Sequence, residues 1–147
     1  LHENGMVIGS HSVTHRFMHQ LSEKEIFEEL SQSKRTLEDI VGQAVECFSV
    51  PRGVHNESVI RIAREVGYTH VFTSQIGTNE RFEYVLKRVA IKRDVNLEGF
   101  KNILDGAPLG EMAFEQKIKD RAKTILGIDT YNRLRRMFVP HAEKKKK

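Results

Sequence analysis

Two histidines, His11 and His15, lie four residues apart in the segment His11-Ser12-Val13-Thr14-His15 and could bind one metal ion. On one turn of helix, residues at this spacing share a face, so two imidazoles can converge. Neutral imidazole is a good zinc ligand, and a catalytic zinc commonly takes three protein ligands and a water. The pair therefore predicts a metal-dependent hydrolase that needs a third ligand. The alternative is two polar side chains on a solvated turn.

Other residues that could do chemistry have ordinary structural interpretations. His19 extends the four-residue spacing, but rings on successive turns of one helix lie too far along its axis for all three to meet one ion. His55 and His70 are interpreted as surface histidines or as core histidines with hydrogen-bond partners. Cys47, in a predicted strand, is interpreted as a small buried hydrophobe. As the single cysteine, it excludes an internal disulfide.

Length and composition predict one hydrophobic core. The chain has 147 residues, of which 39% are hydrophobic. It contains no apolar run long enough to cross a bilayer and no recognisable signal peptide, so we expect no membrane insertion. The first residue is Leu1 rather than methionine, and we expect the chain to begin inside a longer protein. Both the cytoplasm and the cell envelope remain open as its location.

The net charge of +4 is unevenly distributed along the chain. Residues 117–147 contribute +8, whereas the preceding 116 residues contribute −4. The terminal lysines are expected to form a solvated end, and we expect no nucleic-acid partner. One alternative function is a basic module, residues 117–147, that binds an acidic polymer. Deleting the segment would then abolish binding, and salt would weaken it steeply.

Local signals predict alternating strands and helices. Ser22 followed by Glu25 forms a capping-box pattern, and Gly42 is a suitable helix end. Strands are expected at residues 6–9, 47–50, 68–73 and 84–91. Helices are expected at residues 22–42, 56–67, 96–104, 111–126 and 130–138. This β-α-β-α order favours an α/β fold with a mostly parallel sheet covered by helices.

Two blocks of sequence resemble the NodB-like polysaccharide deacetylases, carbohydrate esterase family 4. Residues 9–15, followed by Met18, Leu21 and a capped helix, resemble the second signature, in which H-[ST]-x-x-H supplies two zinc-binding histidines. Residues 48–53 resemble the third signature, an R-x-P-[aromatic]-G turn that follows a strand and walls the site. The helix into Gly67 and the strand to Ser74 agree with the family's continuation. The resemblance covers about residues 1–105.

The resemblance implies a partial, distorted (β/α) barrel with its site at the carboxyl ends of the strands. It implies that His11 and His15 bind zinc or another divalent metal such as cobalt. It further implies that Pro51, Arg52 and Gly53 contact substrate, with the backbone N–H of Arg52 facing the oxyanion. The expected reaction is metal-assisted removal of N-acetyl, or O-acetyl, groups from a polysaccharide or another N-acetylated sugar.

Several family features are absent from the chain. The first signature, T-F-D-D-G, supplies the aspartate ligand and the general base and does not occur here, nor does the later L-x-H signature after Ser74. Ser49 replaces the usual arginine, and Arg52 the usual aromatic residue. No catalytic base or acid is therefore identified. We expect a fragment organised as a partial deacetylase domain (1–110), a helical segment (111–140) and a disordered basic tail (141–147). The alternative is an inactive remnant that binds glycan or metal.

Overall fold

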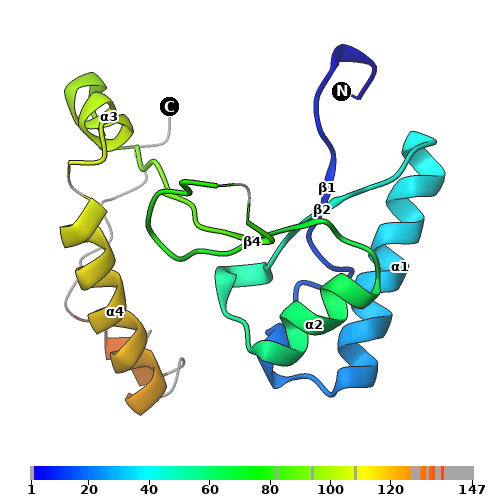
Figure 1. The fold of residues 1–147 in the computed structure, drawn as a ribbon. Coiled ribbons are helices and arrows are strands. Elements are labelled where there is room, and N and C mark those ends of the chain that lie inside the picture. The colour runs from blue at the N-terminus through cyan, green and yellow to red at the C-terminus, as the bar shows by residue number, and fades with distance from the viewer. Residues whose placement is uncertain are drawn as a thin grey trace, which may run out of the picture. The chain divides into compact units, whose positions relative to one another are not determined.

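The computed structural model describes residues 2–81, 83–93, 95–107 and 109–126, together with residues 130, 131, 133, 134 and 137. They belong to two compact units, residues 1–101 and 102–147. The strands are β1 (Gly9–Ser10), β2 (Cys47–Ser49), β3 (His70–Phe72) and β4 (Val85–Leu86). The helices are α1 (Glu23–Val41), α2 (Glu57–Glu65), α3 (Leu97–Leu104) and α4 (Leu109–Leu126) (Figure 1). Short 3₁₀ turns are η1 (His2–Asn4), η2 (Met18–Gln20) and η3 (Pro51–Gly53).

The sheet of the first unit is parallel. Its order in the described residues is β1-β2-β3-β4, and each strand pairs in parallel with its neighbour. Parallel strands need a crossover connection, which α1 provides between β1 and β2 and α2 provides between β2 and β3. The predicted α/β class is therefore confirmed. All four carboxyl ends lie at one edge of the sheet, where side chains from separate parts of the sequence can meet.

The first crossover helix begins and ends at the predicted residues. The Ser22 hydroxyl accepts a bond from the Glu25 N–H at 3.3 Å, and the Glu25 carboxylate accepts one from the Ser22 N–H at 2.9 Å. Gly42 ends the helix with a left-handed φ of 71°. Asn56 caps α2 in the same manner, accepting from the Val59 N–H at 3.1 Å. These caps satisfy N–H groups that would otherwise lack partners in the first turn.

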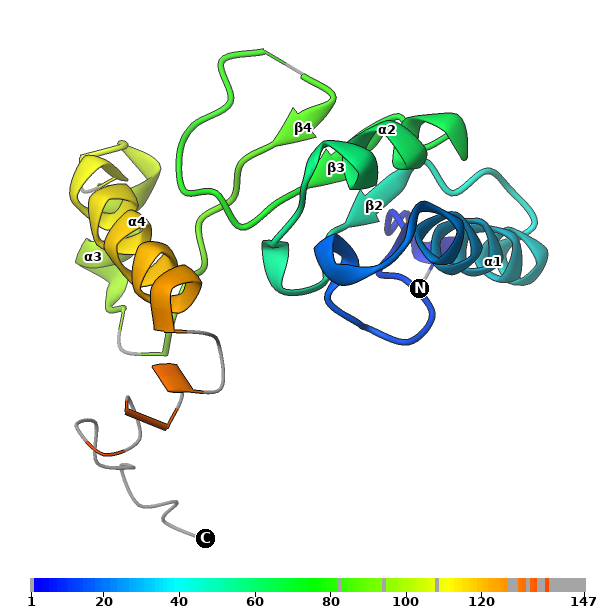
Figure 2. The ribbon, with the colours of Figure 1, turned by 90° about the horizontal axis from the view of Figure 1, so that it is seen from below.

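One face of the sheet packs against α1 and α2, which lie side by side (Figures 1 and 2). Because side chains alternate along a strand, Phe48 and Val71 point to the helices, whereas Cys47 and Phe72 point to the other face. Tyr68 stacks on Phe48 and donates a hydrogen bond to the Leu30 carbonyl at 3.0 Å. The buried apolar cluster is Met18, Ile26, Leu30, Val45, Phe48, Val50, Val59, Ile62, Ala63, Tyr68 and Val71.

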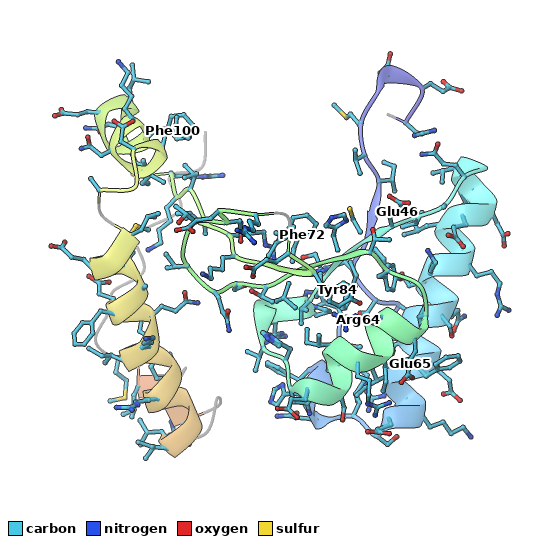
Figure 3. All side chains as sticks on the ribbon, viewed as in Figure 1. Glu46, Arg64, Glu65, Phe72, Tyr84 and Phe100 are labelled. Atoms are coloured by element: carbon cyan, nitrogen blue, oxygen red, sulfur yellow. The ribbon has the colours of Figure 1, made fainter. Side chains whose placement is uncertain are left out.

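A cation–π contact joins α2 to the segment that enters β4. The guanidinium carbon of Arg64 lies 4.2 Å from the centroid of the Tyr84 ring, and Figure 3 shows the two side chains together. Burial raises the pKa of Tyr84, and Arg64 acts in the opposite direction. The contact holds the edge strand close to the helix layer.

The strands are shorter than the sequence predicted. Met6 and Val7, expected in the first strand, are exposed, and pairing begins only at Gly9. The last strand ends at Leu86, where the pairing with β3 changes: the Arg88 side chain donates from Nε to the Thr73 carbonyl at 2.8 Å, and the Arg88 N–H donates to the Gln75 carbonyl at 2.9 Å. The Arg88 side chain thus occupies the Thr73 carbonyl, which a longer strand would pair with a backbone N–H.

The later helices agree with the prediction as far as the structure describes them. Asn96 accepts a bond from the Gly99 N–H at 2.8 Å and starts α3, and α4 covers the helix expected at 111–126. The helix expected at 130–138 lies mostly outside the described residues, and the tail 141–147 lies wholly outside them. None of the helices in the described ranges is long and apolar enough to cross a membrane.

Candidate functional site

A cleft of about 670 Å³ lies at the carboxyl edge of the sheet, within the first unit. Each strand contributes to it: His11 follows β1, Arg52 follows β2, Ser74 follows β3 and Arg88 follows β4. The remaining lining residues are Val7, Gly9, Ser10, Cys47, Ser49, Val50 and Phe72. Figure 3 labels Phe72 among the side chains of the sheet. Parallel α/β folds place their sites at this edge.

The rings of the two candidate metal ligands lie against each other, and His11 lines the cleft. The ring centroids of His11 and His15 are 4.9 Å apart, at an interplanar angle of 62°. With Zn–N distances of ~2.0–2.1 Å, two imidazoles on one tetrahedral ion have centroids roughly 5 Å apart. The separation of the rings therefore fits a shared metal ion. Their assignment as ligands stays a prediction.

The helical explanation for the spacing was wrong. Residues 11–17 form a loop, and Ser12 and His15 have left-handed φ values of 64° and 57°. Among the described residues other than glycine, only these two and Arg52 have positive φ, and all three lie in the two loops that border the cleft. Such conformations cost of order 1–3 kcal/mol each and tend to gather at functional sites.

The His11 ring is oriented by the end of β2. Its Nδ1 lies 2.6 Å from the Ser49 carbonyl oxygen. Because a carbonyl only accepts, Nδ1 carries the proton and Nε2 keeps the lone pair that a metal would bind. The bond uses the backbone of residue 49, so the serine side chain that replaces the family's arginine does not affect it.

A buried carboxylate holds the loop between the histidines. Glu29 of α1 accepts bonds from the N–H groups of Val13 at 2.8 Å and Thr14 at 2.9 Å, and a short bond from the Thr14 hydroxyl. The sequence analysis missed this residue. The sequence did contain a signal for it, because Glu29 lies beside Ile26 and Leu30 on the apolar stripe of the helix. A carboxylate in that position needs hydrogen-bond partners.

The proline turn is the second wall of the cleft. Pro51 is buried, and Gly53, with a φ of +71°, lies so close to Ser74 that a Cβ would overlap it. Arg52 is exposed at the cleft, and its guanidinium lies 4.2 Å from the centroid of the Phe17 ring. Of the three predicted substrate-contact residues, only Arg52 lines the cleft directly. The other two set the position of the turn.

The remaining histidines do not join the pair. His19 lies in η2 with its ring against Phe17, and burial lowers its pKa. His55 donates from Nδ1 to the Gly53 carbonyl at 3.2 Å, and the His70 ring bonds the Thr69 hydroxyl. Within the part of the chain that the structure describes, no group of three or more His, Cys, Asp or Glu side chains could hold a metal ion.

Cys47 differs from its interpretation as a core residue. It is half-buried and lines the cleft. Burial, followed by the charge of neighbouring Glu46, raises the pKa of its thiol. The thiol form therefore dominates at neutral pH, which does not favour a role as nucleophile or metal ligand.

Comparison with known proteins connects these features to one family. Residues 1–71 match the family model described as "Polysaccharide deacetylase". A curated relative, "Putative polysaccharide deacetylase YxkH" of Bacillus subtilis (strain 168), is 26% identical over 100 residues, which are 67% of this chain and 36% of the relative. The chain thus spans about a third of the length of that relative.

Solved structures of the same family share the fold. BC0361, a polysaccharide deacetylase from Bacillus cereus, matches with a TM-score of 0.60 and 26% identity, over 68% of this chain and 33% of that one. The deacetylase PplD of Streptococcus pyogenes, in complex with acetate, matches with a TM-score of 0.60 and 23% identity, over 64% of this chain and 42% of that one. The predicted (β/α)-barrel class is confirmed by these neighbours.

Proposed function

Because residues 1–71 match the polysaccharide deacetylase family model, we propose that this chain provides the histidine ligands of a metal centre that removes acetyl groups from an N- or O-acetylated polysaccharide. The observation that carries the proposal is the pair of rings at the carboxyl edge of the sheet. The centroids of His11 and His15 are 4.9 Å apart. The bond from His11 Nδ1 to the Ser49 carbonyl leaves Nε2 free to bind a metal.

The donor set suits zinc, and cobalt is a ready substitute in a histidine site. Bound by the two rings, a divalent metal would supply a Lewis acid for the acetyl carbonyl and would lower the pKa of a coordinated water. The family resemblance requires a third, carboxylate ligand. None of the described residues that line the cleft is Asp or Glu, so hydrolysis here needs carboxylates from another segment or chain.

The chain's own contribution beyond the metal is substrate binding. The Arg52 guanidinium, held over the Phe17 ring, presents N–H donors to the cleft, where they can bond sugar hydroxyl and carbonyl oxygens. The Ser74 side chain, next to Gly53, also lines the cleft. Pro51 and Gly53 keep the Arg52 N–H on the turn that faces the reacting acetyl group in the family's arrangement.

Acetate release tests the proposal. The chain is incubated with Zn²⁺ or Co²⁺ and N-acetylated oligosaccharides, both alone and fused behind an added segment that carries the Asp-Asp signature expected from the family resemblance. We expect metal-dependent acetate release from the fusion and its loss in His11→Ala. The fusion with both added aspartates changed to asparagine is the matched control. A folded fusion that binds metal and oligosaccharide but releases no acetate would contradict the enzyme proposal and favour an inactive binding remnant.

A further inference from the structure

Glu29 is a carboxylate on the buried face of α1. The residue is only 9% exposed, and its neighbours on that face are Ile26, Leu30 and Ser33, all of them buried. A carboxylate in such a place is unfavourable unless donors surround it. It does not line the cleft, and no bond joins it to either histidine ring in the described residues. Its partners therefore indicate what it does.

All three partners of Glu29 lie between the two histidines. The N–H groups of Val13 and Thr14 both bond Oε2, at 2.8 and 2.9 Å, and the Thr14 hydroxyl bonds Oε1. The next N–H, that of His15, bonds the Ser12 hydroxyl at 3.1 Å. Three successive amides thus end on side-chain oxygens rather than on a helix or strand partner. The path of the loop is set by these side chains.

A second contact lies one helical turn further along α1. The hydroxyl groups of Ser33 and Ser10 are 2.8 Å apart, and both residues are buried. Residues 29 and 33 are four apart and share a face of the helix. The helix therefore holds the chain on both sides of His11, at Ser10 and at residues 13–14.

The charge state of Glu29 suits this role. Burial raises its pKa, but the bonds from the Thr14 hydroxyl and from the Thr14 and Val13 amides, with the charge of Arg16, outweigh burial, and the net shift is downward. At neutral pH the side chain is a carboxylate, which only accepts hydrogen bonds and forms strong ones with N–H donors.

We propose that Glu29 is a positioning residue that sets the backbone between His11 and His15, so that the two rings lie at a metal-binding separation. The inference rests on the proposed function in taking both rings as ligands. It adds that the ligand geometry depends on the first crossover helix. A helix-borne carboxylate replaces the helical turn that would otherwise bring two histidines at this spacing together.

The test compares Glu29 with a matched carboxylate on the same helix. Glu38 also joins α1 to a loop, since its Oε1 accepts from the Val45 N–H at 2.9 Å and from the Lys34 ammonium at 2.9 Å. The variants are Glu29→Ala, Glu29→Gln and Glu38→Ala in the full chain. The measurements are the dissociation constant and visible spectrum of bound Co²⁺, the free energy of unfolding, and hydrogen exchange of the Val13 and Thr14 amides.

We expect Glu29→Ala to weaken Co²⁺ binding by about 10–100-fold, the usual effect of removing a group that orients a ligand. The Val13 and Thr14 amides should exchange faster as well. Glu29→Gln should recover much of the affinity, because its amide oxygen can accept from both N–H groups and its NH₂ can donate to Thr14. Glu38→Ala should lower stability and leave both the Co²⁺ affinity and the spectrum unchanged.

Two results would overturn the proposal: a folded Glu29→Ala that binds Co²⁺ as the parent chain does, or a Glu38→Ala that weakens Co²⁺ binding equally. If Glu29→Ala does not fold, Thr14→Val, which removes only the hydroxyl bond, replaces it and should still weaken binding. If the parent chain binds no Co²⁺, the proposed function fails on its own. Amide exchange in the metal-free protein then decides: faster exchange in Glu29→Ala supports positioning, and unchanged exchange overturns it.

Discussion

Replacing Gly53 by alanine should lower the free energy of unfolding far more than replacing another glycine that has the same backbone conformation. Gly53 has a φ of +71°, and a Cβ there would lie 2.7 Å from the backbone nitrogen of Ser74 and would overlap the Ser74 side chain. The neighbouring Thr73 is held to β4 by a bond from its N–H to the Leu86 carbonyl at 3.0 Å. The backbone at residue 74 therefore cannot move without disturbing the sheet edge.

Gly42 provides the matched control. It has the same φ of +71°, but a Cβ added there would meet nothing within 4 Å. Left-handed backbone costs an ordinary residue roughly 1–2 kcal/mol, and both variants carry that cost. Overpacking adds about 1–3 kcal/mol at Gly53 alone. We therefore expect a loss of ~1–2 kcal/mol for Gly42→Ala and ~2–5 kcal/mol for Gly53→Ala.

Urea denaturation followed by circular dichroism measures both free energies of unfolding, with the slopes compared to check two-state behaviour. Oligosaccharide binding to the folded fraction should fall only in Gly53→Ala, because its clash lies on the wall that carries Arg52. If Gly42→Ala and Gly53→Ala lower the free energy of unfolding by amounts that agree within about 0.5 kcal/mol, the usual range for surface substitutions, the close approach of Gly53 to Ser74 is refuted.

Three further predictions follow from single residues. Tyr68→Phe removes a buried hydrogen bond to the Leu30 carbonyl and should lower the free energy of unfolding, measured by urea denaturation, by about 1 kcal/mol. In the parent chain, burial raises the pKa of Tyr68 to about 12, so absorbance at pH 10 should show no phenolate for this residue. The pKa of Glu29 is below its ordinary 4.5, so its carboxylate stabilises the fold fully above that pH, and this contribution is lost as the pH falls through the folded-state pKa. In Glu29→Gln the free energy of unfolding should therefore fall less steeply on acidification than in the parent chain. An equally steep fall would contradict this. Because burial raises the pKa of the Cys47 thiol, iodoacetamide should modify it more slowly at pH 8 than it modifies free cysteine, and equal rates would contradict the burial.

Local signals were sufficient to predict the helices of the first unit. Ser22 and Asn56 begin their helices as caps, and Gly42 ends one, because each satisfies or terminates the backbone within four residues of itself. Strand length was less predictable. At the end of β4 the Arg88 side chain bonds the Thr73 carbonyl, fifteen positions away in the sequence, and no local pattern reveals that contact.

The sequence proposed two candidate ligands but did not predict the geometry of the loop that carries them. The spacing of His11 and His15 is compatible with a helix, and only the bonds to Glu29 show that the loop follows another path. Those bonds join residues fifteen and sixteen positions apart, beyond the range of helical periodicity. The Ser49 carbonyl is likewise invisible to any rule based on side-chain types, because a backbone oxygen orients the ring.

Metal binding by single-histidine variants tests the central claim most directly. Equilibrium dialysis with Zn²⁺ and Co²⁺ is carried out on the parent chain, on His11→Ala and on His15→Ala. His2→Ala is the control, because that histidine lies in η1 and bonds Gln43 rather than either candidate ligand. We predict that each of the first two variants loses most of the bound metal and that the control keeps it. Equal metal content in all four proteins would contradict the assignment of His11 and His15 as ligands.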